Sequence, residues 1–312
     1  MHADIAFKSV MVTGASGYVG RAVAAGFAAL GCEVLVPVRP GRNVPAFANL
    51  RSIDLPSGSL ADVPDLLSIF KPELLVHCAA YGVQPGDRDP VAMFEVNTKA
   101  TIDLGIAATR HCRALILTGS VSEYALGGTP CPLREDSPLE TQRIYGASKA
   151  AGVVSGLAIA ANAGLPALAL RLFNVFGPGE APHRLIPSLT SRLRRGERVA
   201  LSPGGQLRDF VFIDDIVDAY IAAAARLCAG AVNGALNICT GRPVCVRDLA
   251  TRVAARYGCD TSLLGFGDLA YRPDDVMEVY GAPEAAATEM GWRAKRTIDD
   301  AIDTIYRRDT AL

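Results

Sequence analysis

The sequence is poor in what metal centres and disulfide frameworks require. Its 312 residues include four histidines without ligand spacing and eight cysteines without a C-x-x-C pair. Several cysteines lie inside apolar runs, as buried thiols of cytosolic proteins do. These absences argue against a metal site and against a disulfide framework, and they predict a cytoplasmic protein.

An excess of one charge and long uninterrupted apolar runs are also missing. The formal net charge is −1 and no basic stripe is visible, which argues against nucleic-acid binding. The longest apolar stretches contain glycine turns or charges, so none predicts a membrane-spanning helix. The N-terminus lacks the basic start, apolar run and cleavage site of a signal peptide. We therefore expect neither nucleic acid nor membrane as a partner.

What the sequence does have is apolar material in an alternating pattern. Half of its residues are hydrophobic, which is enough for a large core. Its length suggests about two domains, or one large α/β unit with an added lobe. Strand-like and helix-like segments alternate, and no internal repeat or low-complexity linker interrupts them. This alternation predicts the α/β class.

A glycine-rich turn near the N-terminus predicts a dinucleotide site. It stands between an apolar strand at residues 9–12 and an alanine-rich helix at 21–31. Gly14 permits the tight turn, Gly17 lets the backbone approach a pyrophosphate, and Gly20 lets the helix pack on the strand. The free N–H groups and the dipole of the helix N-terminus favour the diphosphate.

The second predicted strand, residues 33–38, bears on the choice of cofactor. An acid at the end of this strand binds the ribose 2′-hydroxyl of NAD, whereas an arginine suits the 2′-phosphate of NADP. Glu33 has about the right spacing from Gly14, but it starts the strand, and ligands bind at carboxyl ends. Arg39 and Arg42 follow the strand, so NADP(H) is favoured and NAD(H) is the alternative.

Further strands and a helix follow. Residues 74–80 form a predicted strand that runs into small residues, which would let a cofactor lie close to the backbone. His77 within it is expected to be a packed core residue rather than a catalyst. A helix containing Asn97 is predicted at 91–111, and the strand predicted at 114–120 ends in polar residues.

The segment Tyr145-Gly-Ala-Ser-Lys149 carries the candidate acid–base chemistry. On a helix its tyrosine and lysine share one face. The ammonium favours the phenolate, so we expect a lowered pKa for Tyr145 and proton transfer near neutral pH. The helix then continues without a charge from Ala150 to Gly164. One face can pack on the sheet, and a symmetric partner subunit is the simplest cover for the other.

Short motifs follow one another in a fixed order along nearly the whole chain. They are Thr13-Gly-x-x-Gly-x-x-Gly20, His77-x-Ala-Ala80, Ser120, Tyr145-x-x-x-Lys149, Arg171-Leu-Phe-Asn174-Val-Phe-Gly-Pro178, Arg208-Asp-Phe210, Asn237-Ile-Cys-Thr-Gly241, Arg272-Pro-x-Asp275 and Gly291-Trp292. Each is modest alone, but the ordered set is specific. With it the chain resembles an extended short-chain dehydrogenase/reductase, of the NAD-dependent epimerase/dehydratase family that acts on nucleotide-diphosphate sugars.

The resemblance implies an architecture. The fold would be a doubly wound parallel sheet (Rossmann) with a smaller C-terminal substrate lobe. The dinucleotide-binding domain would take residues 1–172 and also 208–240, and the lobe mainly 173–312. A homodimer would form through a four-helix bundle near residues 91–111 and 145–163, which agrees with the uncharged helix.

The resemblance also implies roles. Tyr145 would be the general acid or base at the sugar carbon that exchanges hydride, Lys149 would hold the nicotinamide ribose, and Ser120 would hydrogen-bond the same substrate oxygen. The other implied cofactor contacts are Gly14, Ser16, Gly17, Tyr18, Val19, Arg39, Asp54, Leu55, Ala79, Ala80, Asn97 and Phe173. The implied contacts with the nucleotide-diphosphate sugar are Ser122, Asn174, Arg208 and Arg272. The physics supports the two arginines, because guanidinium groups suit phosphate oxygens.

Other charged residues near these motifs have structural explanations. We expect Asp209, Asp214 and Asp215 to cap the following helix. Arg171 is expected to be a member of a structural ion pair.

The chain departs from the family's 4,6-dehydratases, which place Asp-Glu directly after the catalytic Ser or Thr. Val121 and Ser122 stand there, and Glu123 is one position late. Elimination needs an acid and a base, so dehydration is disfavoured.

Three functions remain. The first is an NADP(H)-dependent reductase of a 4-keto sugar nucleotide, and the second is a sugar-nucleotide 4-epimerase that retains NAD. The third is a non-catalytic dinucleotide-binding sensor, which is disfavoured because Ser120, Tyr145 and Lys149 are all present.

Overall fold

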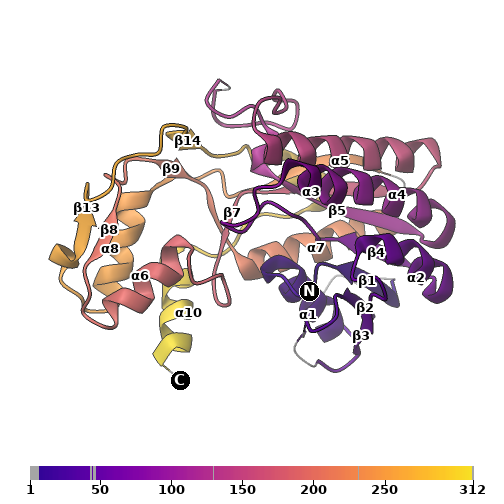
Figure 1. The fold of residues 1–312 in the computed structure, drawn as a ribbon, viewed down its shortest axis with the longest axis horizontal. Coiled ribbons are helices and arrows are strands. Elements are labelled where there is room, and N and C mark those ends of the chain that lie inside the picture. The colour runs from indigo at the N-terminus through magenta and orange to yellow at the C-terminus, as the bar shows by residue number, and fades with distance from the viewer. Residues whose placement is uncertain (1–6, 43, 45–46, 129, 231, 311–312) are drawn as a thin grey trace.

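Seven strands form one parallel sheet in the larger half of the molecule (Figure 1). The computed structural model describes residues 7–42, 44, 47–128, 130–230 and 232–310. The strand order is β11-β6-β5-β4-β1-β2-β3, so the chain winds outward from β1 in both directions, and the predicted doubly wound fold is confirmed. The strands are β1 (Ser9–Thr13), β2 (Glu33–Val38), β3 (Leu50–Asp54), β4 (Leu74–His77), β5 (Ala114–Ser120), β6 (Ala167–Leu172) and β11 (Asn233–Ile238).

Helices cover both faces of the sheet, because successive side chains of each strand point to opposite sides. Val10 and Val12 of β1 belong to the same buried cluster as side chains of α1 (Tyr18–Ala29) and α7 (Ile213–Cys228). Met11, between them, belongs to the cluster on the other face. The helices on that face are α2 (Val63–Phe70), α4 (Ala100–His111) and α5 (Ile144–Asn162).

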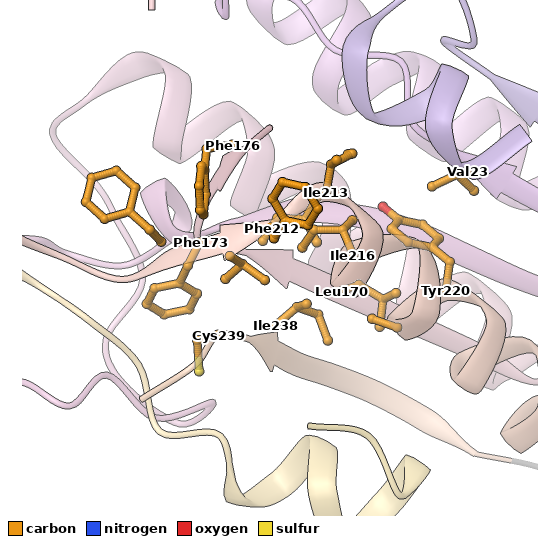
Figure 2. Close-up of a cluster of buried hydrophobic side chains, with 14 of the residues drawn as sticks. Val23, Leu170, Phe173, Phe176, Phe212, Ile213, Ile216, Tyr220, Ile238 and Cys239 are labelled. Atoms are coloured by element: carbon orange, nitrogen blue, oxygen red, sulfur yellow. The ribbon is translucent and has the colours of Figure 1, made fainter. Parts of the chain in front are cut away.

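The core on the α1 and α7 face extends toward the second half of the molecule. Figure 2 shows Leu170 of β6 near Ile216 and Tyr220 of α7, with several phenylalanine rings farther along. Among them, the rings of Phe176 and Phe212 meet edge to face with their centroids 5.6 Å apart. These two rings lie on the paired parallel strands β7 (Asn174–Phe176) and β10 (Phe210–Phe212), which lead into the second half of the molecule.

The second half is built mainly from the C-terminal part of the chain (Figure 1). Short strands β8 (Val199–Leu201) and β13 (Leu264–Phe266) pair in parallel. β9 (Leu207–Arg208) lies between β12 (Val244–Cys245) and β14 (Glu278–Val279). The helices are α6 (Leu185–Leu193), α8 (Val246–Arg256), α9 (Glu284–Met290) and α10 (Ile298–Thr310), and a 3₁₀ turn occurs at η4 (Thr261–Leu263). The larger half has two 3₁₀ turns among its described residues, η1 (Leu60–Asp62) before α2 and η3 (Val121–Glu123) after β5.

The helix predicted at residues 91–111 is present and contains a π-helical turn. α3 (Pro90–Phe94) leads into the π-helical segment η2 (Glu95–Lys99), and α4 follows. A side chain at Gly152 of α5 would overlap the carbonyl oxygen of Asn97, so η2 approaches α5 very closely. The predicted helix is thus present over its whole length, and only its π-helical turn, which apolar spacing does not reveal, was not predicted.

Helix α5 buries one of its faces. Its buried side includes Lys149, Gly152 and Val153, whereas Val154 is 49% exposed. Among the described helices, α5 alone is long and apolar enough to cross a membrane by length and composition. Core helices pass the same test, so this finding is weak evidence for a membrane segment.

Candidate active site

The glycine-rich turn has the geometry that a dinucleotide diphosphate needs. Gly14 has a φ of +73°, and a Cβ there would lie 2.6 Å from the backbone nitrogen of Ala79. A Cβ at Gly20 would overlap the carbonyl oxygen of Gly14, so α1 packs directly against the turn as predicted. Helix α1 begins at Tyr18 with no side chain capping its first turn. The bare helix N-terminus therefore fits an anionic diphosphate.

The ends of β2 and β3 bring three predicted cofactor residues to one edge of the sheet. Arg39 directly follows β2 and is exposed, and Asp54 ends β3 opposite Val38. The Leu55 N–H donates to the carbonyl oxygen of Val38 at 2.8 Å, which holds the two strand ends together. Glu33 lies at the other end of β2, away from this edge.

Asn97 braces the small residues that follow β4. It is 1% exposed, its Oδ1 accepts the Tyr81 N–H at 2.9 Å, and its Nδ2 donates to the Tyr81 carbonyl oxygen at 2.9 Å. Nδ2 also donates to Ser148 Oγ at 3.0 Å. Asn97 thus ties the segment after Ala79 and Ala80 to α5, while its own contact with a cofactor stays a prediction.

His77 is a core residue, as expected. It is 1% exposed, and its ring nitrogens lie 2.7 Å from Thr13 Oγ1 and 3.2 Å from Thr101 Oγ1. Burial, aided by the nearby Lys149 charge, lowers the pKa of His77 to about 3. The ring therefore stays neutral and serves to join β1, β4 and α4.

Ser120, Tyr145 and Lys149 come together at the carboxyl end of β5. Ser120 ends β5, and its side chain lies near enough to Tyr145 to act on the pKa of the phenol. The Lys149 ammonium is 4% exposed and donates to the carbonyl oxygen of Thr118 at 2.7 Å. The structure thus assembles the three predicted catalytic residues.

The expected lowering of the Tyr145 pKa is wrong for the free protein. Burial raises the pKa of Tyr145 to about 12, although the nearby Ser120 side chain acts in the opposite direction. Burial also lowers the pKa of Lys149. Spacing of four residues on a helix shows that the two side chains share a face, but it does not show how far the phenol is removed from water.

Glu123 is fully buried beside the catalytic residues and is bound on both oxygens. Its Oε1 accepts the Ser120 N–H at 2.7 Å, and its Oε2 accepts Arg171 Nε at 2.9 Å. Arg171 is 4% exposed, so the ion pair is internal and the prediction for Arg171 is confirmed. Both carboxylate oxygens of Glu123 are thus bonded inside the protein, which points to a structural role.

The expectation that three aspartates cap α7 is wrong in detail. Asp209 instead accepts the N–H groups of Thr240 and Gly241, at 2.8 and 2.9 Å, and so fixes the turn after β11. Asp214 and Asp215 lie in the first turn of α7, where Phe212 is the cap residue and makes no side-chain cap bond. Asp215 pairs with Arg296 at 2.6 Å.

A cavity of about 450 Å³ lies next to the catalytic residues. Its walls come from the loop after β4, from β7, from the start of α6 and from the β9–β10 region. A Cβ at Gly82, which lines the cavity, would lie 2.7 Å from Tyr145 Cδ2, so the phenol ring stands directly behind the wall. The cavity therefore gives a ligand a place beside the predicted proton donor.

Three of the four predicted substrate residues line this cavity, namely Asn174, Arg208 and Arg272. Arg208 Nη2 donates to Asp275 Oδ1 at 3.0 Å, which orients its guanidinium group. Asn174 Oδ1 is buried and has no hydrogen-bond partner in the described part of the chain. Ser122 is not among the lining residues, and its N–H donates to Ser120 Oγ at 3.1 Å.

Sequence reasoning missed four charged or titratable cavity residues. They are Arg88, Glu180, His183 and Arg184. Three of them belong to a loop that directly follows the Arg171–Pro178 motif and precedes α6. A glycine- and proline-rich segment that carries charges just after a strand end was the available signal.

Likeness to known proteins covers most of the chain. The sequence profile of the NAD-dependent epimerase/dehydratase family matches residues 10–239. The dTDP-6-deoxy-L-talose 4-dehydrogenase (NAD(P)(+)) of Kitasatospora kifunensis is 28% identical over 95% of this chain and 94% of its own length. The UDP-glucose 4-epimerase of Mycolicibacterium smegmatis is 30% identical over 80% of this chain and 82% of its own length.

A solved structure has a similar fold over nearly the whole chain. The Bordetella bronchiseptica enzyme WbmG, crystallised with NAD and UDP, matches 98% of this chain with 96% of its own at a TM-score of 0.82. The two sequences are 26% identical. The range matched by the family profile contains Gly14, Tyr145 and Arg208, so it covers the glycine turn and most of the cavity, whereas Arg272 lies beyond it.

Proposed function

The chain belongs to the NAD-dependent epimerase/dehydratase family, and from this membership we propose that it exchanges hydride at a carbon of a nucleotide-diphosphate sugar. The observation that carries the proposal is the joint position of Asn174, Arg208 and Arg272 in one cavity beside Tyr145. A diphosphate offers oxygens to two guanidinium groups, and the sugar beyond it would extend toward the phenol.

The residues of the chain supply the proton side of the reaction. A bound nicotinamide supplies or accepts the hydride. Tyr145 carries its proton at neutral pH, because burial raises its pKa to about 12, and it is therefore a donor to a sugar carbonyl oxygen. Ser120 would hydrogen-bond the same substrate oxygen as Tyr145, and Lys149 is in place on the same helix face to hold a ribose.

Reduction of a 4-keto sugar nucleotide with NADP(H) is the first candidate. It is supported by Arg39, which stands exposed at the end of β2, where an acid would serve NAD. A 4-epimerase that retains NAD is the second candidate, supported by the likeness to a UDP-glucose 4-epimerase. Dehydration is disfavoured, because Glu123 is committed to Ser120 and Arg171.

The binding proposal is tested by replacing the two cavity arginines. Arg208→Ala and Arg272→Ala should each raise the Kd for UDP or dTDP roughly 10- to 150-fold, since a charge-assisted hydrogen bond contributes about 1.5–3 kcal/mol. Isothermal titration measures this, and circular dichroism checks the fold. Arg195→Ala is the control, because Arg195 is exposed and paired with Glu197 outside the cavity. If neither nucleoside diphosphate binds the parent protein, the sugar-nucleotide assignment fails.

The two candidate reactions are separated by their products. We would incubate the protein with NADPH and a dTDP-4-keto-6-deoxy sugar, and separately with UDP-glucose and NAD, and follow the sugar products by mass spectrometry and NMR. Stoichiometric consumption of NADPH supports the reductase. Interconversion of the two C4 epimers without net consumption of cofactor supports the epimerase.

We also propose two features of organisation. The dinucleotide-binding domain takes residues 1–172 and 208–240, with the remainder mainly in the substrate lobe. The protein forms a homodimer through α4 and α5, supported by the exposed apolar side chains Ile106 and Val154 on these helices.

A further inference from the structure

The loop of residues 177–184 touches both the cofactor turn and the substrate cavity. On one side, Arg21 of α1 donates to the Gly179 carbonyl oxygen at 3.2 Å, and a Cβ at Gly177 would lie 3.1 Å from the Tyr18 hydroxyl oxygen. On the other side, Glu180 and Arg184 line the cavity. The loop is therefore a direct physical link between the two sites.

Two buried polar atoms in this link have no hydrogen-bond partner among the described residues. They are the hydroxyl oxygen of Tyr18 and Oε2 of Glu180. The Glu180 side chain is only 7% exposed, and its other oxygen, Oε1, accepts Arg184 Nε at 3.2 Å. An unmatched donor thus lies in the same buried region as an unmatched acceptor, and native proteins rarely leave such groups unpaired.

Both groups lie against Gly177: the Glu180 N–H donates to the Gly177 carbonyl oxygen at 3.2 Å, and a Cβ at Gly177 would lie 3.1 Å from the Tyr18 hydroxyl oxygen. Burial raises the pKa of Tyr18, and the negative charge of Glu180 raises it further. Both effects keep the Tyr18 hydroxyl protonated, so it can donate. Burial likewise raises the pKa of Glu180, whereas Arg184 opposes that rise.

Of the three residues Tyr18, Glu180 and Arg184, Arg184 is the one that a ligand can reach. Its side chain is 46% exposed and lies at the cavity wall, whereas its partner Glu180 is buried. A diphosphate in the cavity would compete with Glu180 for the guanidinium group, because Arg forks bind phosphate oxygens well. Glu180 would then need a new donor, and Tyr18 is the unpartnered one beside it.

We propose that Tyr18 and Glu180 are a positioning pair that forms when the cavity is filled. An anionic ligand draws Arg184 away from Glu180, and the Tyr18 hydroxyl then donates its hydrogen bond to Glu180 Oε2. The new bond fastens the loop of residues 177–184 to the glycine turn, and so it couples nucleotide binding to the alignment of the cofactor. The pair rests on the proposed function, since it requires an anionic ligand in this cavity.

The test measures two properties of Tyr18→Phe, namely the Tm of the ligand-free protein and its Kd for UDP. In the free protein the hydroxyl has no partner among the described residues, so its removal should leave the Tm unchanged or raise it. In the complex the bond is lost, so the Kd for UDP at saturating NAD should rise about tenfold, equivalent to about 1.4 kcal/mol. The matched control is Tyr124→Phe, because the Tyr124 hydroxyl already donates to Asn237 Oδ1 at 2.6 Å and its loss should lower the Tm.

A double-mutant cycle identifies the partner. In a Glu180→Ala background, Tyr18→Phe should change the Kd for UDP by less than about twofold, because contacting groups are not additive. A Tm loss for Tyr18→Phe as large as that for Tyr124→Phe, or equal tenfold effects in both backgrounds, overturns the pair. If UDP and dTDP fail to bind the parent protein, the proposed function fails, and the Tm comparison still decides whether the Tyr18 hydroxyl is bonded in the free protein.

Discussion

Tyr145 keeps its proton in the free protein because its surroundings exclude water. The ring stands behind Gly82 at the cavity wall, and burial raises its pKa to about 12. A group with this pKa donates a proton readily only when the acceptor develops negative charge, as a carbonyl oxygen does during reduction. The local geometry therefore favours the acid role of Tyr145 at neutral pH.

Replacing Tyr145 with Phe should abolish turnover and spare binding. The proton donor is lost while the ring remains, so kcat should fall about 10²- to 10⁴-fold. Steady-state kinetics measure the loss, and fluorescence titration of the dinucleotide measures retained binding. Tyr81→Phe is a control at another tyrosine of the same region, outside the predicted catalytic set. A Phe variant that keeps most of its kcat would show that another group is the acid.

Arg39 should set the preference between the two dinucleotides. It stands exposed at the carboxyl end of β2, so its guanidinium group is free to bind a 2′-phosphate. We expect NADPH to bind more tightly than NADH, and Arg39→Ala to weaken NADPH about tenfold or more, with little effect on NADH. Paired titrations check this, and equal affinities in the parent protein contradict it.

Among the elements, the turn η3 connects the end of β5 to β6 through hydrogen bonds. Glu123 within it accepts from Ser120 of β5 and from Arg171 of β6, and Glu123 and Arg171 are both buried. A buried ion pair of this kind places Ser120 relative to the Tyr145 helix. Its geometry therefore serves the site even though Glu123 does not contact the cavity.

Glu123→Gln should destabilise the protein strongly. The variant leaves the buried Arg171 charge without a counter-charge, which typically costs about 3–5 kcal/mol of the free energy of unfolding. Urea denaturation followed by circular dichroism measures the change. Glu197→Gln is the control, since its ion pair with Arg195 is exposed and should cost less than about 1 kcal/mol. Similar small losses in both variants would contradict the structural role of the internal pair.

The elements show what the sequence can and cannot predict. The limits of β2 and β5 and the positions of Gly14 and Gly20 follow from apolar runs and turn chemistry, and the structure agrees with them. The π-helical segment at Asn97, which lies very close to α5, was not predicted, because apolar spacing does not reveal it. The pKa of Tyr145 was predicted in the wrong direction for a similar reason, since burial is a property of packing rather than of spacing.

At the scale of the whole molecule, the cavity likewise contains residues that could be predicted before the structure and residues that could not. Asn174, Arg208 and Arg272 lie far apart in the sequence, and only the family resemblance brought them together before the structure did. Glu180 and Arg184 were missed, because their importance comes from how one loop packs on α1 and on the cavity. A single sequence gives residue types and spacing, but it does not give that packing.

A dimer through α4 and α5 should be sensitive to charge on the apolar surface of these helices. Val154→Glu should convert the predicted dimer to a monomer, because Val154 is 49% exposed in one protomer and would meet apolar side chains of the other. Light scattering coupled to gel filtration measures the mass. Ile69→Glu on α2 is the control, at 69% exposure and outside the predicted interface. A parent protein that elutes as a monomer would rule out this dimer.

Because β11 lies far from β6 in the sequence, β6 lacks this neighbouring strand until late in synthesis. On the ribosome β6 emerges well before β11, because residues 173–232 come between them and include much of the cavity wall. Until β11 pairs with β6, the strand β6, which is buried along its whole length in the finished protein, is an edge of the nascent sheet, and such edges recruit strands from other chains. A fragment ending at Leu172 should therefore aggregate, and the minimal unit that can be expressed alone extends beyond Ile238.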